Sequence, residues 1–363
     1  MQSVVDLFAG CGGGSMGFHA AGLRTVGAVE IDTDAATAFT LNVGIPPIVK
    51  DIRDVSGADL LAGTGLRRGQ LTVLFGCPPC QSFTVLRRGA APTRKDRRRN
   101  ALVHEYLRLV DELKPRHIAF ENVPGLVEGR WHRYFDTFRD VLSELGYKID
   151  WRVVDAAEYG VPQRRRRVLV IGSRVTDPRL PAPTHDEVGG GRLKPFVTVR
   201  DTISELRALS AGECDPDDEF HRARRHSDLA IRRLACIPEG GARADLPEDL
   251  VLACHREHNG HYDIYGRMWW DRVAPTLTSG CTNVTRGRFA HPSQNRAITL
   301  REAMLLQTFP PRARLSGGME KMSLQVGNAV PSRLAERIGR TIKSMERAAS
   351  PTAKGSAKRS RSR

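Results

Sequence analysis

The chain lacks any stretch near the roughly 18 consecutive apolar residues that a membrane-spanning helix requires. Residues 1–10 also lack the basic start and the small-residue cleavage site of a secretory signal. We therefore expect a soluble cytoplasmic protein that does not bind membranes.

Cysteine is too scattered for a disulfide framework. The seven cysteines, an odd number, are Cys11, Cys77, Cys80, Cys214, Cys236, Cys254 and Cys281. A chain of 363 residues can bury a core without such cross-links, so reduced thiols are expected. Zinc would need a second ligand pair beside Cys77 and Cys80, and Cys254-His255 has no partner nearby. We expect no metal site.

Acidic residues are too few to balance the basic ones. The formal net charge is +15 and the isoelectric point is near 10.0. That much like charge repels itself unless a polyanion is the working partner, so nucleic acid is the leading candidate. Part of the excess lies in a basic tail, residues 349–363, for which we expect disorder. Other arginines cluster at 87–99, 164–167 and 222–233.

The first third of the chain alternates short Val/Ile/Leu/Phe runs with amphipathic stretches. This pattern predicts βαβ units, an α/β fold whose mostly parallel sheet has helices on both faces. From about residue 177 the sequence becomes rich in Pro, Gly, His, Asp and Arg, with weak periodicity. We predict a catalytic and cofactor-binding domain over 1–176, completed by 324–348, and a smaller irregular domain with a hinge over 177–323.

A glycine-rich turn, "DLFAGCGGGSMGF" from Asp6 to Phe18, follows the first predicted strand. Such turns let a ligand approach the backbone at the carboxyl end of a strand, although some are only tight turns. Glu30 ends the second predicted strand, where an acidic side chain binds ribose hydroxyls, and Asp51 follows the third. No Gly-Lys-Ser/Thr follows to hold a triphosphate. A cofactor with ribose and adenine but no phosphate chain fits best.

The segment "GCPPCQSF", Gly76 to Phe83, follows another apolar strand. A redox pair, half of a zinc site or a nucleophile would each explain a cysteine there. A redox pair normally opens a helix, whereas this one precedes an arginine-rich loop, so a nucleophile is favoured. Cys77 is interpreted as a buried, inert cysteine.

Two further stretches carry charged residues at strand ends. "AFENVPG" places Glu121 at the end of an apolar strand, and "QRRRR" leads directly into "VLVIG". Strand alternation sends Arg165 and Arg167 to one face, where an inward-facing pair needs an anion or another acceptor. The alternative is that the arginines of "QRRRR" form only a solvent-exposed charged segment without a site.

These pieces, in this order, resemble the cytosine-5 DNA methyltransferase family of the bacterial, S-adenosylmethionine-dependent type. "DLFAGCGGGSMGF" is similar to its first motif, "GCPPCQSF" to its Pro-Cys loop, "FENV" to its Glu-Asn-Val motif and "QRRRR" to its Gln-x-Arg-x-Arg motif. "ITLREAMLLQTFP" and "QVGNAVP" resemble its last two motifs. The resemblance spans most of the chain and implies a Rossmann-like methyltransferase sheet.

The resemblance implies that the enzyme methylates carbon 5 of a flipped-out cytosine in a specific sequence of double-stranded DNA. Cys80 would add to carbon 6 of the ring, and Glu121 would hydrogen-bond and protonate nitrogen 3. Arg165 would hold the carbonyl oxygen, with Arg167 and Gln163 in support. The base must leave the duplex stack for this chemistry.

The resemblance also implies a cofactor site and a target recognition domain. The S-adenosylmethionine site would be lined by Phe8, Ala9, Gly10, Gly12, Gly13, Glu30, Ile31, Asp51, Ile52, Pro79, Leu102 and Asn328. The loop with arginines 87–99 would close over DNA. Thr276 and Thr278 would belong to the DNA-facing framework, and Trp269 and Trp270 to the core. Side chains that could read bases are Arg267, Asn283, Arg286 and Arg288.

Alternatives stay open at this point. An RNA cytosine-5 methyltransferase shares the DNA-type motifs, and a catalytically silent DNA-binding relative or a Cys-x-x-Cys oxidoreductase would explain fewer of them. A cognate restriction endonuclease is a candidate partner of the enzyme. One chain carries every motif, so a monomer suffices.

Overall fold

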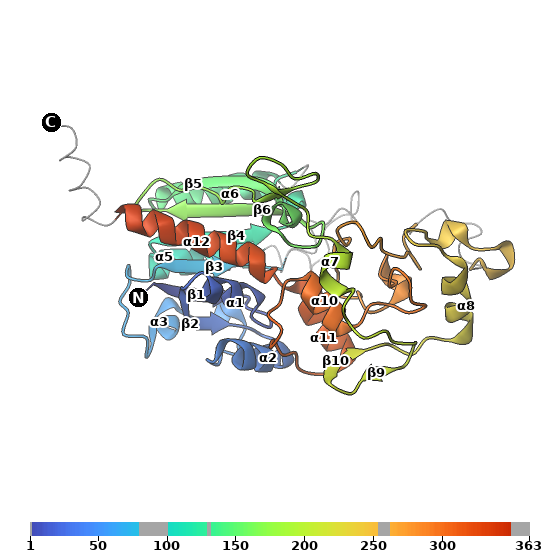
Figure 1. The fold of residues 1–363 in the computed structure, drawn as a ribbon. Helices are drawn as coiled ribbons and strands as arrows, with labels where there is room; N and C mark the ends of the chain where they lie inside the picture. The colour runs from blue at the N-terminus through green and yellow to red at the C-terminus, as the bar shows by residue number, and fades with distance from the viewer. Residues whose placement is uncertain (1, 80–100, 129–131, 253–261, 350–363) are drawn as a thin grey trace. The chain divides into compact units, whose positions relative to one another are not determined.

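A computed structural model describes residues 2–79, 101–128, 132–252 and 262–349 of the protein (Figure 1). The chain divides into two compact units. The first comprises residues 1–155, 166–182 and 332–363, and the second comprises residues 156–165 and 183–331. The chain therefore leaves the first unit twice and returns to it twice.

The first unit is built on a six-stranded sheet with the order β2-β1-β3-β4-β6-β5. Neighbours among β2, β1, β3 and β4 pair in parallel, whereas β6 is antiparallel to both β4 and β5. The strands are β1 Ser3–Leu7, β2 Arg24–Val29, β3 Val73–Gly76, β4 His117–Asn122, β5 Lys148–Asp155 and β6 Arg166–Ser173. The expected α/β sheet is confirmed.

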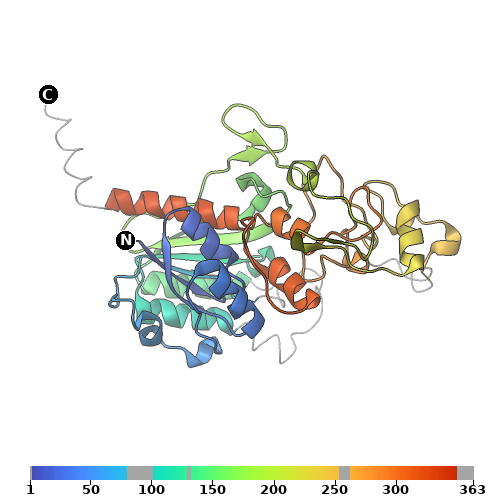
Figure 2. The ribbon, with the colours of Figure 1, turned by 60° about the horizontal axis from the view of Figure 1, so that its bottom comes forward.

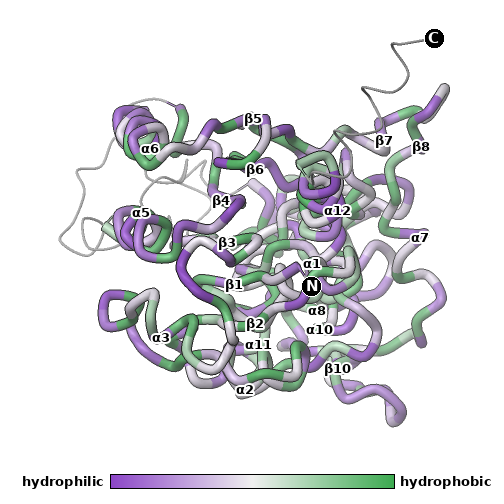
Figure 3. The backbone as a smooth tube through the Cα atoms, turned by 90° about the vertical axis from the view of Figure 1, so that its left-hand side faces the viewer, coloured by the Kyte–Doolittle hydropathy of each residue, from purple (hydrophilic) through white to green (hydrophobic). Residues whose placement is uncertain are grey.

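Helices cover both faces of this sheet (Figure 3). In that view α3, α5 and α6 lie on one side of the strands, and α1 and α12 lie on the other. The helices of the unit are α1 Gly13–Ala20, α2 Thr33–Val43, α3 Gly57–Leu61, α5 Leu102–Leu113, α6 His132–Glu144 and α12 Ser332–Ala349, with 3-10 turns η1 Ile52–Asp54 and η4 Pro124–Leu126. Because both faces are covered, β1 and β4 are buried along their whole length.

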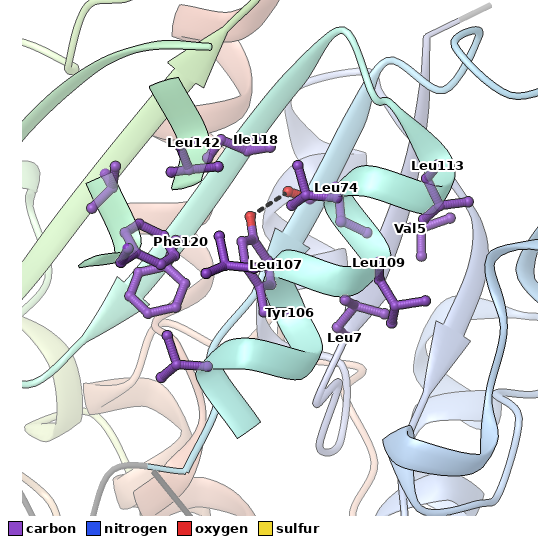
Figure 4. Packing of buried hydrophobic residues seen from close by; sticks show 14 of the residues in the cluster. Val5, Leu7, Leu74, Tyr106, Leu107, Leu109, Leu113, Ile118, Phe120 and Leu142 are labelled. Atoms are coloured by element: carbon purple, nitrogen blue, oxygen red, sulfur yellow. Dashed lines mark hydrogen bonds between the residues drawn. The ribbon is translucent and has the colours of Figure 1, made fainter. Parts of the chain in front are cut away.

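The core between α5 and the sheet is centred on Tyr106 (Figure 4). Its ring packs on Phe120, and its hydroxyl donates to the carbonyl oxygens of Leu74 at 3.2 Å and Ala119 at 3.3 Å. The one polar atom of this large side chain is thereby satisfied, and the hydrogen bonds tie α5 to two adjacent strands.

The C-terminal helix α12 returns to pack against α1, the red and dark-blue helices of Figure 2. A Cβ atom at Gly17 would lie 2.2 Å from the carbonyl oxygen of Ser332, so the two backbones approach more closely than a side chain allows. The Ser332 hydroxyl also donates to the Gly13 carbonyl at 3.0 Å. The last helix thus supports the helix that follows the glycine-rich turn.

The second unit has little regular structure. Its elements are η6 Ala156–Tyr159, β7 His185–Asp186, β8 Lys194–Pro195, α7 Val199–Ile203, β9 Cys214–Asp215, β10 Asp218–Arg222, α8 Asp228–Cys236, η7 Arg243–Asp245, η8 Glu248–Leu250, η9 Val284–Arg286, α10 Leu300–Leu306 and α11 Met319–Asn328. With so few ladder hydrogen bonds, buried loop carbonyls need side-chain donors.

Candidate active site

The parallel strands of the first unit bring their carboxyl ends to one edge of the sheet. The pairing sets Leu7 beside both Val29 and Gly76, and Gly76 beside Phe120. The residues that follow these strand ends therefore lie along that edge, where open α/β sheets bind their ligands. They are the glycine-rich turn, Glu30 and Cys77, and they are joined there by Glu121 near the end of β4.

The glycine-rich turn follows β1 in an unusual backbone conformation. Phe8, Gly10 and Gly12 have φ values of 61°, 54° and 92°. A Cβ atom at Gly10 would meet no atom within 4 Å, so this part of the backbone faces open space. At Gly12 a Cβ atom would lie 2.9 Å from Val43, so the turn also needs glycine for packing. An accessible backbone is what a closely held ligand requires.

Glu30 shapes this turn with both of its carboxylate oxygens. One accepts from the backbone N–H of Gly10 at 2.7 Å, and the other accepts from Ile31 and Asp32 at 2.8 Å each. The Ile31 side chain beside it is 64% exposed, which is high for a large apolar residue. A carboxylate next to an exposed apolar side chain suits a ribose joined to a flat base.

Beneath the turn lies a buried polar chain that sequence reasoning missed. Ser15 donates to the Asp6 carboxylate at 2.7 Å, and Thr25 donates to the Ser15 hydroxyl at 3.1 Å. Burial raises the pKa of Asp6 from 3.8 to about 7, against the lowering effect of the Ser15 hydrogen bond. In the sequence, the position of Asp6 inside an apolar strand is the one feature that indicates a buried carboxyl group with polar partners.

The Asp6→Asn variant is expected to gain stability relative to the wild type as the pH rises from 5 to 8. The unfolded carboxyl ionises near pH 4 and the folded one near pH 7, so folding takes up a proton in this window and wild-type stability falls with rising pH. The full effect is on the order of 4 kcal/mol above pH 7, and asparagine does not ionise. Calorimetry measures the melting temperatures of the variant and the wild type at pH 5 and pH 8. The same difference between the two proteins at both pH values would contradict the prediction.

The remaining predicted cofactor residues are distributed over both units. Asp51 caps η1 and pairs with Arg53 at 2.8 Å, while Ile52 is buried. Pro79 is exposed after β3, and Leu102 is the half-buried first residue of α5. Asn328 is the exposed last residue of α11 and belongs to the second unit.

Glu121 is 2% exposed, yet its carboxylate has two close partners within the first unit. Arg167 places its Nε atom 2.9 Å from Oε1, and the Cys77 thiol donates to Oε2 at 2.8 Å. Arg167 reaches this position because β6 is antiparallel to β4, with Asn122 opposite Val168. Cys77 is half-buried and hydrogen-bonded, so the prediction that it is buried is wrong.

Gln163 and Arg165 lie in the second unit, in the segment before β6, and both are almost fully buried. Gln163 accepts from the Leu277 N–H at 3.0 Å and donates to the Gln307 side chain at 3.2 Å. Arg165 donates to the carbonyls of Leu277 and Gly327, each at 3.2 Å. These contacts join the "QRRRR" stretch to the segment around Leu277, to "ITLREAMLLQTFP" through Gln307 and to "QVGNAVP" through Gly327. Thr276 joins the same group by donating to the Arg164 carbonyl at 2.6 Å.

Cys80 and the arginines at 87–99 lie outside the described residues, so the predictions for them rest on the sequence.

One predicted base-reading residue has a different role. Arg267 is 4% exposed and donates to the carbonyls of Leu234, Ile237, His291 and Gln294 and to the Asn295 side chain. It therefore fastens loops of the second unit together, and the prediction that it reads bases is wrong.

Trp269 and Trp270 are half-buried rather than core residues. The guanidinium groups of Arg272 and Arg288 lie 4.8 Å and 4.6 Å from the centroid of the Trp269 ring. Each contact has the geometry of a cation–π interaction.

Among the helices that the structure describes, none is long and apolar enough to cross a membrane. Within the same residues, no group of three His, Cys, Asp or Glu side chains is placed to hold a metal ion.

Comparisons with known proteins identify the family. The model of the C-5 cytosine-specific DNA methylase family matches residues 2–344. The chain is 36% identical over 351 residues to Type II methylase M.HgiDII of Herpetosiphon aurantiacus, covering 94% of this chain and 95% of the relative. It is 31% identical to Type II methyltransferase M.XorII of Xanthomonas oryzae pv. oryzae, covering 93% and 84%.

Solved structures share the fold. A prophage-encoded DNA modification methyltransferase from E. coli superposes with a TM-score of 0.73 at 24% identity, over 96% of this chain and all (100%) of that one. The S. pombe Dnmt2 methyltransferase has a TM-score of 0.61 at 18% identity, over 96% and 99%. The family match over nearly the whole chain places the protein in the C-5 cytosine-specific DNA methylase family, as a DNA (cytosine-5) methyltransferase.

Proposed function

We propose that this DNA methyltransferase transfers a methyl group from S-adenosylmethionine to carbon 5 of a cytosine flipped out of double-stranded DNA, through a covalent bond between Cys80 and carbon 6. The observation that carries the proposal is the buried Glu121 carboxylate, which shares one sheet edge with the glycine-rich turn. A proton donor for the base and a cradle for the methyl donor are then neighbours.

The residues at the turn fit S-adenosylmethionine, which when bound supplies the methyl group. The backbone at Gly10 faces open space, Glu30 offers carboxylate oxygens, and Ile31 offers an exposed apolar surface for the adenine. Phe8, Asp51, Pro79 and Leu102 would complete the site.

In the proposed mechanism the Cys80 thiolate adds its electron pair to carbon 6 of cytosine. Glu121 gives a proton to nitrogen 3 as negative charge reaches it, so that carbon 5 becomes nucleophilic. Arg165 holds the carbonyl oxygen. After carbon 5 is methylated, its proton leaves to a base, the 5,6 double bond re-forms and Cys80 departs as a thiolate. Nitrogen 3 then returns its proton to Glu121, so that the acid is restored and the product is neutral.

Residues 177–323 are proposed to contain the target recognition domain. The enzyme is further proposed to be the modification enzyme of a type II restriction–modification system with a cognate endonuclease, a reading supported by the Type II names of its relatives. The basic charge of +15 supports a polyanionic substrate.

Labelled methyl transfer from S-adenosylmethionine to plasmid DNA and, in parallel, to bulk tRNA tests the proposal. The expected result is label on DNA, and bisulfite sequencing should locate it in one short motif. Label on tRNA alone would assign the chain to RNA modification. Bound cofactor without any transfer would indicate a silent DNA-binding protein.

The Glu30→Gln variant is expected to bind S-adenosylmethionine about tenfold to a hundredfold more weakly, because hydrogen bonds to a charged group contribute roughly 1.5–3 kcal/mol each. Both Glu30 oxygens accept backbone N–H groups, and an amide presents N–H₂ to one of them. Calorimetric titration measures the Kd. Glu144→Gln, at the exposed end of α6, is the matched control. An unchanged Kd for Glu30→Gln would misplace the cofactor site.

A further inference from the structure

We infer that Cys77 is a positioning residue, whose thiol holds the Glu121 carboxylate in the orientation in which it meets the cytosine ring. The inference rests on the proposed function, which gives Glu121 its role. It assigns a task to the first cysteine of "GCPPCQSF", the one that the chemistry at Cys80 leaves unexplained.

Strand register brings the two residues together. β3 and β4 pair in parallel with Gly76 beside Phe120. The next residue of each chain segment, Cys77 after Gly76 and Glu121 after Phe120, therefore lies beside the other. A second contact holds the same two strand ends, because the Asn122 side chain donates to the Pro78 carbonyl at 3.4 Å. The relation between thiol and carboxylate is therefore built into the sheet.

The carboxylate has one hydrogen bond, from the Cys77 thiol to Oε2, and one ion pair, between Arg167 and Oε1, which accepts no hydrogen bond from the described residues. The terminal torsion of a glutamate side chain has a broad energy profile, so one contact leaves the carboxylate free to rotate. Arg167 is 2.9 Å from Oε1 and the Cys77 thiol is 2.8 Å from Oε2. Each carboxylate oxygen has more than one lone pair, so both can still meet a substrate.

The orientation matters because nitrogen 3 and the amino group of cytosine lie in the plane of the ring. A carboxylic acid can serve both atoms only when its own plane is close to that of the ring. If the hydrogen bond from Cys77 is lost, the carboxyl group samples rotations that serve one atom at a time, and the chemical step slows more than binding does.

Three substitutions of Cys77 separate hydrogen bonding from packing. Cys77→Ala and Cys77→Val remove the donor, with less and more volume respectively, whereas Cys77→Ser keeps a donor. We expect kcat to fall about tenfold in the first two and to stay within about threefold of wild type in the serine variant. KM for DNA and for S-adenosylmethionine should change by less than about twofold. Cys236→Ala, at the exposed end of α8, controls for loss of a cysteine.

A double-mutant comparison tests whether Cys77 acts through Glu121. In a Glu121→Gln background, Cys77→Ala should reduce the single-turnover rate no further. An independent tenfold loss there, or equal losses in the alanine and serine variants, would overturn the inference. If Cys77→Ala fails to fold, the comparison of Cys77→Ser with Cys77→Val carries the test.

The same measurements separate the inference from the proposed function. If Glu121→Gln retains the wild-type rate, the role of Glu121 is wrong and the proposed mechanism fails. If Glu121→Gln is inactive while Cys77→Ala has the wild-type kcat, only the inference fails.

Discussion

The Glu121→Gln variant is expected to transfer methyl groups about a thousandfold more slowly than the wild type, within the range of about 10²–10⁴ that a general acid contributes. An amide cannot give the proton that nitrogen 3 of cytosine needs when Cys80 adds to the ring. The side chain is only 2% exposed, so bulk water is poorly placed to replace it.

Single-turnover methyl transfer measures this effect without interference from product release. S-adenosylmethionine affinity and the melting temperature are measured in parallel, because glutamine also loses the ion pair with Arg167 or turns its N–H₂ toward the Cys77 thiol. The exposed Glu144→Gln substitution is the control for a lost negative charge. A rate above one tenth of wild type, with both other readouts unchanged, would remove Glu121 from the proton-transfer step.

The sheet of the first unit was largely predictable from the sequence. Apolar runs alternate with amphipathic stretches, and this pattern predicts βαβ units whose strand ends carry the motifs. The antiparallel placement of β6 between β4 and β5 was not predictable, because β4 and β6 are largely buried strands whose apolar residues suit either direction. That placement is what brings Arg167 to Glu121.

The positions of the motifs are readable from the sequence, but the partners of their side chains are not. Cys77 and Glu121 are 44 residues apart, and only the β3–β4 register makes them neighbours. The roles of the site residues named from the family resemblance are predictions, and so is that of Cys80, which lies outside the described residues.

Sequence reasoning was least successful in the second unit because arginine is usually a surface residue. In a unit with few strands, loop carbonyls are buried without ladder partners, and a guanidinium with five N–H donors can satisfy several of them at once. Arg267 does this with four carbonyls. A net charge that suggests DNA contacts therefore includes cations that hold the fold together.

Glu302 is the position where a single substitution is expected to cost the second unit most. Its carboxylate forms a two-bond pair with Arg296, at 2.8 Å and 2.7 Å, and both side chains are at most 1% exposed. It also accepts the Thr299 N–H at 2.7 Å in the cap of α10. Burial alone would raise the pKa of Glu302, but the hydrogen bonds and charge of Arg296 lower it overall.

The Glu302→Gln variant is expected to lose about 3–5 kcal/mol of stability, because it leaves the Arg296 charge buried without its counter-ion. Replacing both partners, Arg296→Met with Glu302→Leu, should recover much of the loss, since apolar groups of similar volume need no pairing. Asp271→Asn breaks the exposed pair with Arg200 in the same unit and should change the melting temperature little.

Because the folded pKa of Glu302 is lowered, the wild-type advantage over Glu302→Gln is present above the unfolded value of 4.5 and shrinks as the pH falls below it. Calorimetry at pH 7 and pH 4 measures both effects, and a Glu302→Gln protein as stable as Asp271→Asn would show that the buried pair is not what holds α10 to its loops.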